Sequence, residues 1–384
     1  MSELLLNPHR VPGYRSAIPP IGPRSFHFRL PGYAATPLRS LAPLAARLGI
    51  ADLRVKDESS RLGLPAYKVL GASWATYRAI SIRLGRPPEP WADLAQLRQH
   101  LSGLTPLRLV TATDGNHGRG VARVARWLDW PAEVYLPRGS APARLEGIRS
   151  EGARVIEVDG TYDETVARAA EAGEAADALL IQDHGWPGYE EIPAWVAEGY
   201  ETIFTEVDEE LARSGVTGPQ VVLVQIGVGT LASAVIRHYR RPGLAAPPTL
   251  IGVEPTGAAC ALRSIAAGRP VMLTVGADAS IMAGLNCGTP SSAAWPAMRD
   301  GMDAFLAVDD VVAMRAMREL ADAGVTAGES GAAGLAGLLA LLRPEHGEAC
   351  ARLGIGAASR VLLLNTEGAT DPEAWTRVVG RPPG

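Results

Sequence analysis

The chain has 384 residues, of which 47% are hydrophobic and 20% are charged, and its formal net charge is −4. This is the composition of a globular protein of two or three lobes, and it excludes a disordered or fibrous chain. The small acidic excess disfavours a nucleic-acid partner, because such proteins usually carry a basic surface.

From residue 50 onward, short β-branched segments alternate with segments rich in Ala, Leu and Arg. The predicted strands are Leu53–Lys56, Leu109–Thr113, Glu133–Leu136, Arg154–Val158, Ala178–Gln182, Val221–Ile226, Thr249–Val253, Phe305–Val308 and Val361–Asn365. The predicted helices include Val69–Leu84, Gly118–Leu128, Tyr162–Ala176, Ile192–Ser214, Ala232–Tyr239, Asp310–Ala323 and Ala332–Leu342. Strands that alternate with helices of this length predict an α/β fold of parallel sheets with right-handed crossovers.

The order of these elements predicts two open, twisted parallel-sheet lobes, with the smaller inserted into the larger. Residues 71–190 contain four of the predicted strands and would form the small lobe. Residues 1–70 and 191–384 would form the large lobe. Because no flexible linker separates the two lobes, we expect the active site in the cleft between them.

Several classes of site are disfavoured. No apolar segment approaches the ~18 residues that span a bilayer, and no secretory signal is recognisable, so we expect a cytoplasmic protein that does not engage a membrane. Three cysteines, at 260, 287 and 350, form neither a disulfide scaffold nor a zinc-binding pattern, and we predict no metal site.

Lysine is rare in this chain. Only Lys56 and Lys68 occur among 37 basic residues, which is typical of a genome that favours arginine codons. A lysine retained under such a bias marks a place that arginine cannot fill, because a buried lysine can lose its proton and act as a base or a nucleophile. Lys68 follows the Gly63–Pro65 break and begins a predicted helix, although a solvated surface lysine is the plain alternative.

Two glycine-rich turns follow predicted strands. The first, Thr111-Ala-Thr-Asp-Gly-Asn-His-Gly-Arg-Gly120, connects a strand to a helix, where open α/β sheets bind small ligands. The second, Gln225-Ile-Gly-Val-Gly-Thr-Leu-Ala-Ser233, can present backbone N–H groups to a phosphate at a helix start. It is neither a dinucleotide fingerprint nor a Walker loop. Each could also be a simple turn.

Three further polar segments lie at strand ends: Asp183-His-Gly-Trp-Pro-Gly-Tyr-Glu-Glu-Ile-Pro193, Gly328-Glu-Ser-Gly-Ala-Ala-Gly334 and Asn365-Thr-Glu-Gly-Ala-Thr-Asp371. Together, a lysine, a Gly-Asn-His turn, a phosphate-type loop and a polar strand end match the needs of one cofactor. Pyridoxal 5′-phosphate requires an amine for its aldehyde, a contact to its phenolic oxygen, a phosphate cup and a partner for its ring nitrogen.

These motifs resemble those of the fold-type II pyridoxal-phosphate enzymes, the group of tryptophan synthase β and threonine dehydratase. Within this group the chain is most similar to the diaminopropionate ammonia-lyases. The similarity extends from Gly32-Tyr-Ala-Ala-Thr-Pro-Leu38 to Asp371. It implies a carbon–nitrogen lyase that works as a homodimer on a small amino-acid substrate.

The resemblance also implies a role for each motif. Lys68 would carry the cofactor as the internal aldimine, and Asn116 would contact its phenolic oxygen. A loop of Gly227, Val228, Gly229 and Thr230 would hold the phosphate. Asn365 would lie near the pyridine nitrogen, with Thr366 as second choice. Such an uncharged partner would leave that nitrogen largely unprotonated, which favours elimination.

Two carboxylates distinguish this chain from the serine and threonine dehydratases. The resemblance implies that those enzymes usually carry Ser at the position of Asp114. Asp114 would suit a substrate with a second ammonium group, and it could exchange a proton with the substrate. Asp183 offers another carboxylate. With Lys68 and an aspartate on opposite faces, both enantiomers of 2,3-diaminopropionate could be converted to pyruvate and two ammonia molecules.

Alternatives remain open at this point. A serine or threonine dehydratase, or a β-replacement enzyme, would use the same motifs without a need for Asp114 and Asp183. A non-catalytic binding protein on this scaffold is a third hypothesis, against which the presence of Lys68 argues. Cys260 and Cys287 lie where the relatives also carry cysteines, and they could form a bridge or remain thiols.

Overall fold

The computed structural model describes residues 2–16, 22–88, 90–113, 115–276 and 279–384. The chain divides into two compact units, which are described one at a time. The first unit comprises Met1–Pro20, Ala35–Ser60 and Ile203–Gly384, and the second comprises Ile21–Ala34 and Arg61–Thr202. The sequence prediction drew its boundaries at 70/71 and 190/191 and assigned no N-terminal segment to the smaller lobe.

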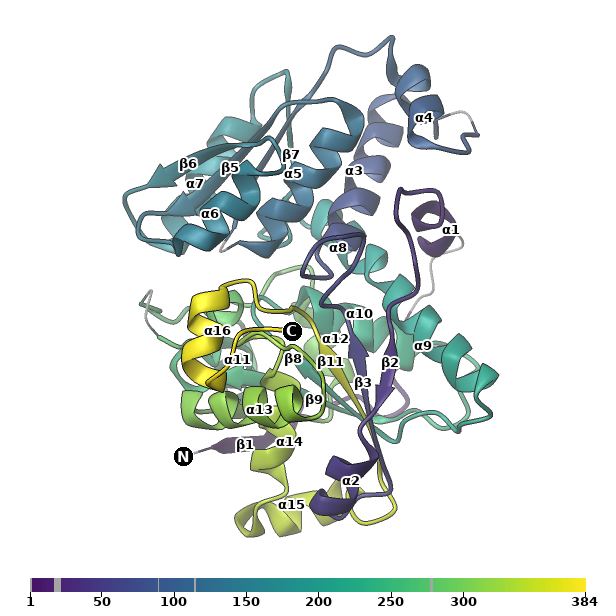
Figure 1. Cartoon of the computed structure of the whole chain (residues 1–384), viewed down its shortest axis with the longest axis vertical. Helices are drawn as coiled ribbons and strands as arrows, with labels where there is room; N and C mark the ends of the chain where they lie inside the picture. The colour runs from purple at the N-terminus through teal and green to yellow at the C-terminus, as the bar shows by residue number, and fades with distance from the viewer. Residues whose placement is uncertain (1, 17–21, 89, 114, 277–278) are drawn as a thin grey trace. The chain divides into compact units, whose positions relative to one another are not determined.

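A seven-stranded sheet forms the centre of the first unit (Figure 1). Its order is β1 (Glu3–Leu6), β10 (Ala304–Val308), β9 (Thr249–Pro255), β8 (Val221–Gln225), β11 (Arg360–Asn365), β3 (Asp52–Asp57) and β2 (Leu38–Ser40). The five central strands are parallel, and the edge strands β1 and β2 pair antiparallel with β10 and β3. Parallel strands place their carboxyl ends along one edge, where ligand-binding loops gather.

Helices cover both faces of this sheet, as its continuously apolar strands require. α14 (Ala333–Leu341) packs on β8, β9, β10 and β11, and every one of its residues is buried. Gly337 permits this contact, because a Cβ there would lie 2.5 Å from Val253 Cγ2. α10 (Thr230–Tyr239) packs on β8, and α11 (Cys260–Ala267) packs on β9 and β10. The remaining helices of the first unit are α2 (Ala42–Leu48), α12 (Trp295–Gly301), α13 (Asp310–Asp322), α15 (Gly347–Arg352), α16 (Pro372–Val379) and most of α9 (Glu201–Arg213).

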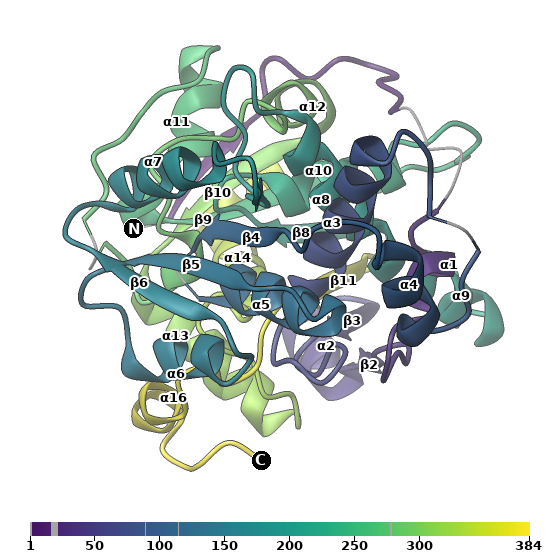
Figure 2. The same cartoon turned by 90° about the horizontal axis from the view of Figure 1, so that it is seen from above.

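The second unit contains a four-stranded parallel sheet in the order β6 (Arg154–Val158), β5 (Ala132–Pro137), β4 (Arg108–Ala112) and β7 (Ala178–Leu180). Figure 2 shows β4, β5 and β6 side by side, with α5 (Asn116–Leu128) and α7 (Tyr162–Gly173) against them. The other helices of this unit are α1 (Arg24–His27), α3 (Val69–Arg83), α4 (Leu94–Leu101), α6 (Pro142–Arg149) and α8 (Glu191–Gly199). The predicted α/β class with two parallel-strand sheets is confirmed.

All nine predicted strands are present, and six of the seven predicted helices are single helices close to their expected bounds. The prediction of one helix over Ile192–Ser214 is wrong, because the segment divides into α8 and α9 at Tyr200. The edge strands β1 and β2 were not predicted. They are three and four residues long and none of their residues is fully buried, and segments this short give too little pattern to predict a strand.

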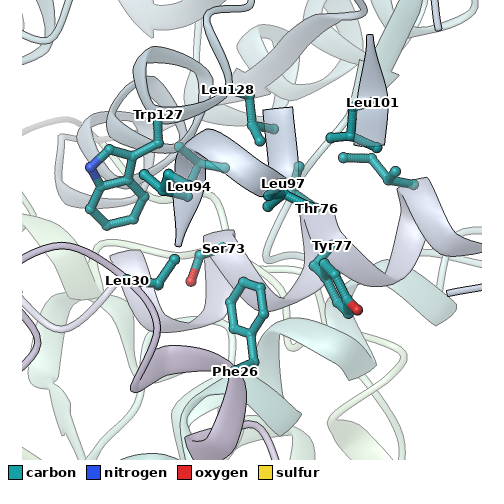
Figure 3. A pocket seen from close by; sticks show the side chains of 12 residues that line it. Phe26, Leu30, Ser73, Thr76, Tyr77, Leu94, Leu97, Leu101, Trp127 and Leu128 are labelled. Atoms are coloured by element: carbon teal, nitrogen blue, oxygen red, sulfur yellow. The ribbon is translucent and has the colours of Figure 1, made fainter. Parts of the chain in front are cut away.

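An apolar pocket lies within the second unit around α3 (Figure 3). Its walls are formed by Phe26, Leu30, Ser73, Thr76, Tyr77, Ile80, Leu94, Leu97, Leu101, Val124, Trp127 and Leu128. These side chains include no charged group and none of the predicted site residues. Within the described ranges, no helix is both long and apolar enough to cross a membrane.

Candidate active site

Lys68 stands directly before α3, as the sequence predicted, and its backbone is held against α5. A Cβ on Gly120 of α5 would lie 3.1 Å from the Val69 nitrogen and 3.2 Å from the Lys68 carbonyl carbon. Only a glycine therefore allows this approach without a shift of the neighbouring backbone. The same helix begins with Asn116, so that α5 fixes two predicted cofactor contacts with respect to each other.

The side chain of Lys68 is held by an aspartate from another part of the second unit. Lys68 Nζ donates a hydrogen bond to Asp183 Oδ2 over 2.5 Å. Asp183 follows β7, and its side chain is 7% exposed, against 20% for Lys68. Behind the carboxylate lies His117, whose Nδ1 is 3.7 Å from Asp183 Oδ2. The other ring nitrogen, Nε2, contacts the Ile181 carbonyl oxygen at 2.8 Å, which fixes the ring.

The charges of this cluster shift both ionisations. Burial alone would raise the pKa of Asp183, but the positive charges of His117 and Lys68 hold that pKa well below its usual range. Burial alone would lower the pKa of Lys68, but the Asp183 carboxylate raises that pKa above its ordinary value. Without a cofactor, the two residues therefore form an ammonium–carboxylate pair.

The turn between β4 and α5 is organised by one hydroxyl group. Thr113 Oγ1 accepts hydrogen bonds from the backbone N–H of Gly115 at 2.9 Å and of Gly118 at 3.0 Å. Gly118 has no space for a side chain, because a Cβ would lie 2.4 Å from Thr113 Cγ2. This geometry places Asn116 at the first turn of α5. Asp114, which the sequence singled out in the same turn, lies outside the described residues.

In the first unit, the predicted phosphate loop connects β8 to α10. Gly229 has a φ of +99°, and a Cβ there would lie 2.6 Å from Met298 Sδ. No side chain caps the N-terminus of α10. Its first backbone N–H groups and the positive end of the helix dipole therefore offer a site for a phosphate, which Gly227, Val228, Gly229 and Thr230 would surround.

Asn365 and Thr366, at the polar end of β11, differ in the hydrogen bonds that they can still offer to a ligand. Asn365 Nδ2 donates to Asp57 Oδ1 at 2.9 Å and to the Thr326 carbonyl at 3.1 Å. Its Oδ1 is buried and accepts no hydrogen bond from the described residues. Thr366 Oγ1 accepts a hydrogen bond from Gln225 Nε2 at 3.1 Å. Thr366 thus retains a proton to donate, whereas Asn365 can only accept from a ligand.

Lys56, the other lysine, is 1% exposed and lies in an ion pair inside the first unit. Lys56 Nζ donates to Glu206 Oε2 at 2.6 Å and to the Thr36 carbonyl at 2.7 Å. Because these partners satisfy the ammonium group, Lys56 is a structural residue. Cys260 and Cys287 carry thiols, so the disulfide alternative does not describe this structure.

The structure therefore brings Lys68, directly before α3, and Asp183, after β7, together in the second unit, which also carries Asn116 at the start of α5. In the first unit it brings the Gly227–Thr230 loop, Asn365 and Thr366 to the carboxyl ends of neighbouring strands β8 and β11. The sequence analysis assigned no role to His117 or Gln225. His117 stood inside a quoted motif, but its contact with Asp183 depends on residues 66 positions apart.

These side chains suit pyridoxal phosphate. Lys68 supplies a reactive amine at a helix start, the Gly229 loop supplies an uncapped helix N-terminus, and Thr366 supplies a hydroxyl donor. The described residues contain no cluster of three or more side chains that could ligate a metal ion.

Comparisons with known proteins identify the family. Residues 29–366 match the family model of pyridoxal-phosphate dependent enzymes. The diaminopropionate ammonia-lyase of Salmonella typhimurium is 39% identical over 92% of this chain and 90% of its own. That of Escherichia coli K12 is 37% identical over 93% and 90%.

A solved structure agrees. Diaminopropionate ammonia-lyase from Escherichia coli, in complex with an aminoacrylate-PLP azomethine reaction intermediate, matches with a TM-score of 0.88 and 34% identity, over 99% of this chain and 97% of that one. The chain belongs to the pyridoxal-phosphate dependent enzymes and, within that family, to the group of the diaminopropionate ammonia-lyases.

Proposed function

We propose that this enzyme catalyses the α,β-elimination of 2,3-diaminopropionate, in its L and also its D form, to pyruvate and two molecules of ammonia. The similarity to named diaminopropionate ammonia-lyases over nine tenths of both chains supports this reaction. The structural observation that carries it is the buried pair of Lys68 and Asp183, an amine and a carboxylate in hydrogen-bond contact.

Pyridoxal phosphate, when bound, supplies an electron sink that stabilises negative charge on the substrate Cα. The protein must then provide a covalent anchor, hold the substrate and move protons. Lys68 Nζ is the anchor for the cofactor aldehyde. With substrate bound, Lys68 Nζ would be the base that takes the Cα proton from one face.

Asp183 and Asp114 handle the second amine of the substrate. We assign Asp183 to the departing β-amine, because its carboxyl group is buried next to Lys68 and His117 and can pass on a proton that these groups hold. Asp114 would pair with the substrate ammonium and serve the Cα proton on the face opposite Lys68. This assignment rests on the Asp-Gly-Asn-His motif.

Cofactor contacts are proposed for residues of both units. Asn116 would bind the phenolic oxygen, and the loop of Gly227, Val228, Gly229 and Thr230 would bind the phosphate. For the pyridine nitrogen we favour Thr366 over Asn365, the reverse of the order drawn from sequence. An unprotonated ring nitrogen needs a donor, and the Asn365 amide hydrogens are already engaged by Asp57 and Thr326.

The test is pyruvate release from L- and D-2,3-diaminopropionate, with L-serine and L-threonine as controls. We expect turnover of both diaminopropionate enantiomers, and a kcat/KM for serine at least tenfold lower. A preference for serine or threonine would instead assign the enzyme to the hydroxy-amino-acid dehydratases.

We also propose that the enzyme is a cytoplasmic homodimer, on the basis of the family resemblance. Light scattering on the purified holoenzyme should give about twice the chain mass of 40.4 kDa. A mass of one chain would refute the dimer.

A further inference from the structure

Gln225 is a buried glutamine at the end of β8 to which the proposed function assigns no role. It is 3% exposed, and it lies just beyond the point where β8 and β11 stop pairing, because the ladder between them ends at Leu223 and Leu363. Its side chain continues the connection. Gln225 Nε2 donates to the carbonyl oxygens of Leu364 and Ser330, each over 3.0 Å. The amide therefore joins β8 to β11 and to the loop that precedes α14.

The loop that carries the Ser330 carbonyl group is fastened to the end of β11. Glu367 accepts the backbone N–H of Ser330 on Oε1 at 3.0 Å and the N–H of Gly328 on its carbonyl oxygen at 2.9 Å. Gly331 allows this close packing, because a Cβ there would lie 2.5 Å from the Glu367 carbonyl oxygen. The Gln225 amide therefore meets acceptors that are fixed in place.

These acceptors determine which way the Gln225 amide is turned. A carbonyl oxygen can only accept a hydrogen bond, so the side of the amide that faces Ser330 and Leu364 must be the amino group. The same amino group lies 3.1 Å from Thr366 Oγ1. Because the amino group of an amide does not accept hydrogen bonds, the Thr366 hydroxyl can accept from Gln225 but cannot donate to it.

The proton of the Thr366 hydroxyl group must therefore point away from Gln225. Thr366 is 5% exposed, and its hydroxyl donates no hydrogen bond within the part of the chain that the structure describes. It directly follows β11, the strand beside β8, and β8 leads into the Gly227–Thr230 loop. A buried hydroxyl proton that the protein leaves without an acceptor is suited to a ligand atom with a lone pair.

We propose that Gln225 is a positioning residue that sets the direction of the Thr366 hydroxyl group, so that its proton is offered to the ring nitrogen of the cofactor. This inference rests on the proposed function, in which Thr366 contacts that nitrogen. Gln225 occupies the accepting side of the hydroxyl and leaves the donating side for the ligand. Both side chains are neutral, so they provide a hydrogen bond to the nitrogen without an acid that would protonate it.

The experiment compares Gln225→Glu and Gln225→Met with Gln220→Met, in the wild-type chain and in the Thr366→Val chain. Gln220 is the matched control, because it stands just before β8, at the opposite end of the strand, and its side-chain oxygen accepts the N–H of Arg360 in β11 at 3.2 Å. Each chain is loaded with pyridoxal phosphate that carries nitrogen-15 in its ring. The readouts are the nitrogen-15 resonance, the dissociation constant of the cofactor and the melting temperature.

Gln225→Glu reverses the direction of the hydrogen bond, because a carboxylate accepts the Thr366 proton. We expect it to move the resonance as far as Thr366→Val does and to weaken cofactor binding about 3- to 10-fold. Gln225→Met removes the donor but leaves the hydroxyl proton free, so it should move the resonance in the same direction by a smaller amount. In the Thr366→Val chain neither substitution should move the resonance further. Gln220→Met should leave the resonance in its wild-type position, whatever its effect on the melting temperature.

The inference is overturned if both Gln225 variants leave the resonance in its wild-type position. It is also overturned if they move the resonance equally in the Thr366→Val chain, because Gln225 would then act on the fold and not through Thr366, or if Gln220→Met moves it as far as Gln225→Met. Should Gln225→Glu not fold, Gln225→Met decides by the same criteria. If Thr366→Val itself does not move the resonance, the proposed contact of Thr366 fails and the inference fails with it. No substrate is involved, so failure of diaminopropionate as a substrate would leave these results intact.

Discussion

Lys68 and Asp183 are 115 residues apart in the chain, and yet Lys68 Nζ and Asp183 Oδ2 are 2.5 Å apart. The pair keeps the lysine charged and in place before the cofactor arrives. The lysine must lose that charge to attack an aldehyde, so we expect Asp183 to slow the loading of the cofactor.

Asp183→Asn should therefore have opposite effects on two measurements. Without the carboxylate, the pKa of Lys68 falls, so at pH 8 the apoenzyme should capture pyridoxal phosphate at least tenfold faster, as followed by the visible absorbance. Turnover of diaminopropionate should fall by ~10²- to 10⁴-fold, because the acid for the departing amine is lost. Slower capture would contradict the ion pair as the cause of the raised pKa.

Asp114→Asn tests the substrate assignment. The variant should retain the cofactor spectrum and lose most of its diaminopropionate activity, since an ammonium–carboxylate contact contributes about 10- to 150-fold in binding. If Asp114 serves one face only, one enantiomer should suffer much more than the other, and we expect this to be the D form. Near-wild-type rates with both enantiomers would show that Asp114 has no catalytic role and serves only to form the turn.

Thr366→Val should affect cofactor binding, whereas Asn365→Ala should affect the stability of the fold. Thr366→Val removes the proposed donor to the ring nitrogen and should weaken cofactor binding about 3- to 10-fold, with a changed visible spectrum. Asn365→Ala breaks the contacts to Asp57 and Thr326 and should mainly lower the melting temperature of the apoenzyme. A spectral change only in Asn365→Ala would restore the order drawn from sequence.

Asp57→Asn should alter stability in a pH-dependent manner. Burial opposes ionisation of Asp57, but hydrogen bonds from Ser59, Arg39 and Asn365 hold its pKa below the ordinary value. A carboxyl group whose pKa is lowered by folding stabilises the fold at any pH above its pKa in the unfolded chain, which is ~3.9. This stabilisation is lost as the pH falls through the lower pKa of the folded chain. The variant should thus be less stable by about 1.5–3 kcal/mol at pH 7, and the difference should shrink below pH 4. Urea unfolding at pH 7, 4 and 3 measures it, and a difference that stays constant down to pH 3 would contradict the linkage.

The sequence was most informative where chemistry and local structure depend on neighbouring residues. The central strands are continuous apolar runs, and Lys68 and the Gly229 loop lie in motifs that each occupy one turn. Long-range partners left no such signal. The contact of His117 with Asp183 and the hydrogen bond that orients Asn365 toward Asp57 both depend on how distant segments fold together. We propose the reverse order of Asn365 and Thr366 for this reason, because a residue type does not reveal which of its hydrogens are already engaged.

The burial of Lys56 has a practical consequence. With Lys56 enclosed in its ion pair and every other basic side chain an arginine or a histidine, Lys68 is the one lysine with part of its side chain exposed. The aldehyde of pyridoxal phosphate also reacts with the exposed surface lysines of most proteins. This chain has no fully exposed lysine for such a side reaction. Borohydride fixation of the holoenzyme should therefore give one modified lysine per chain, and the labelled peptide should contain Lys68. Labelling on Lys56 would reverse the assignment.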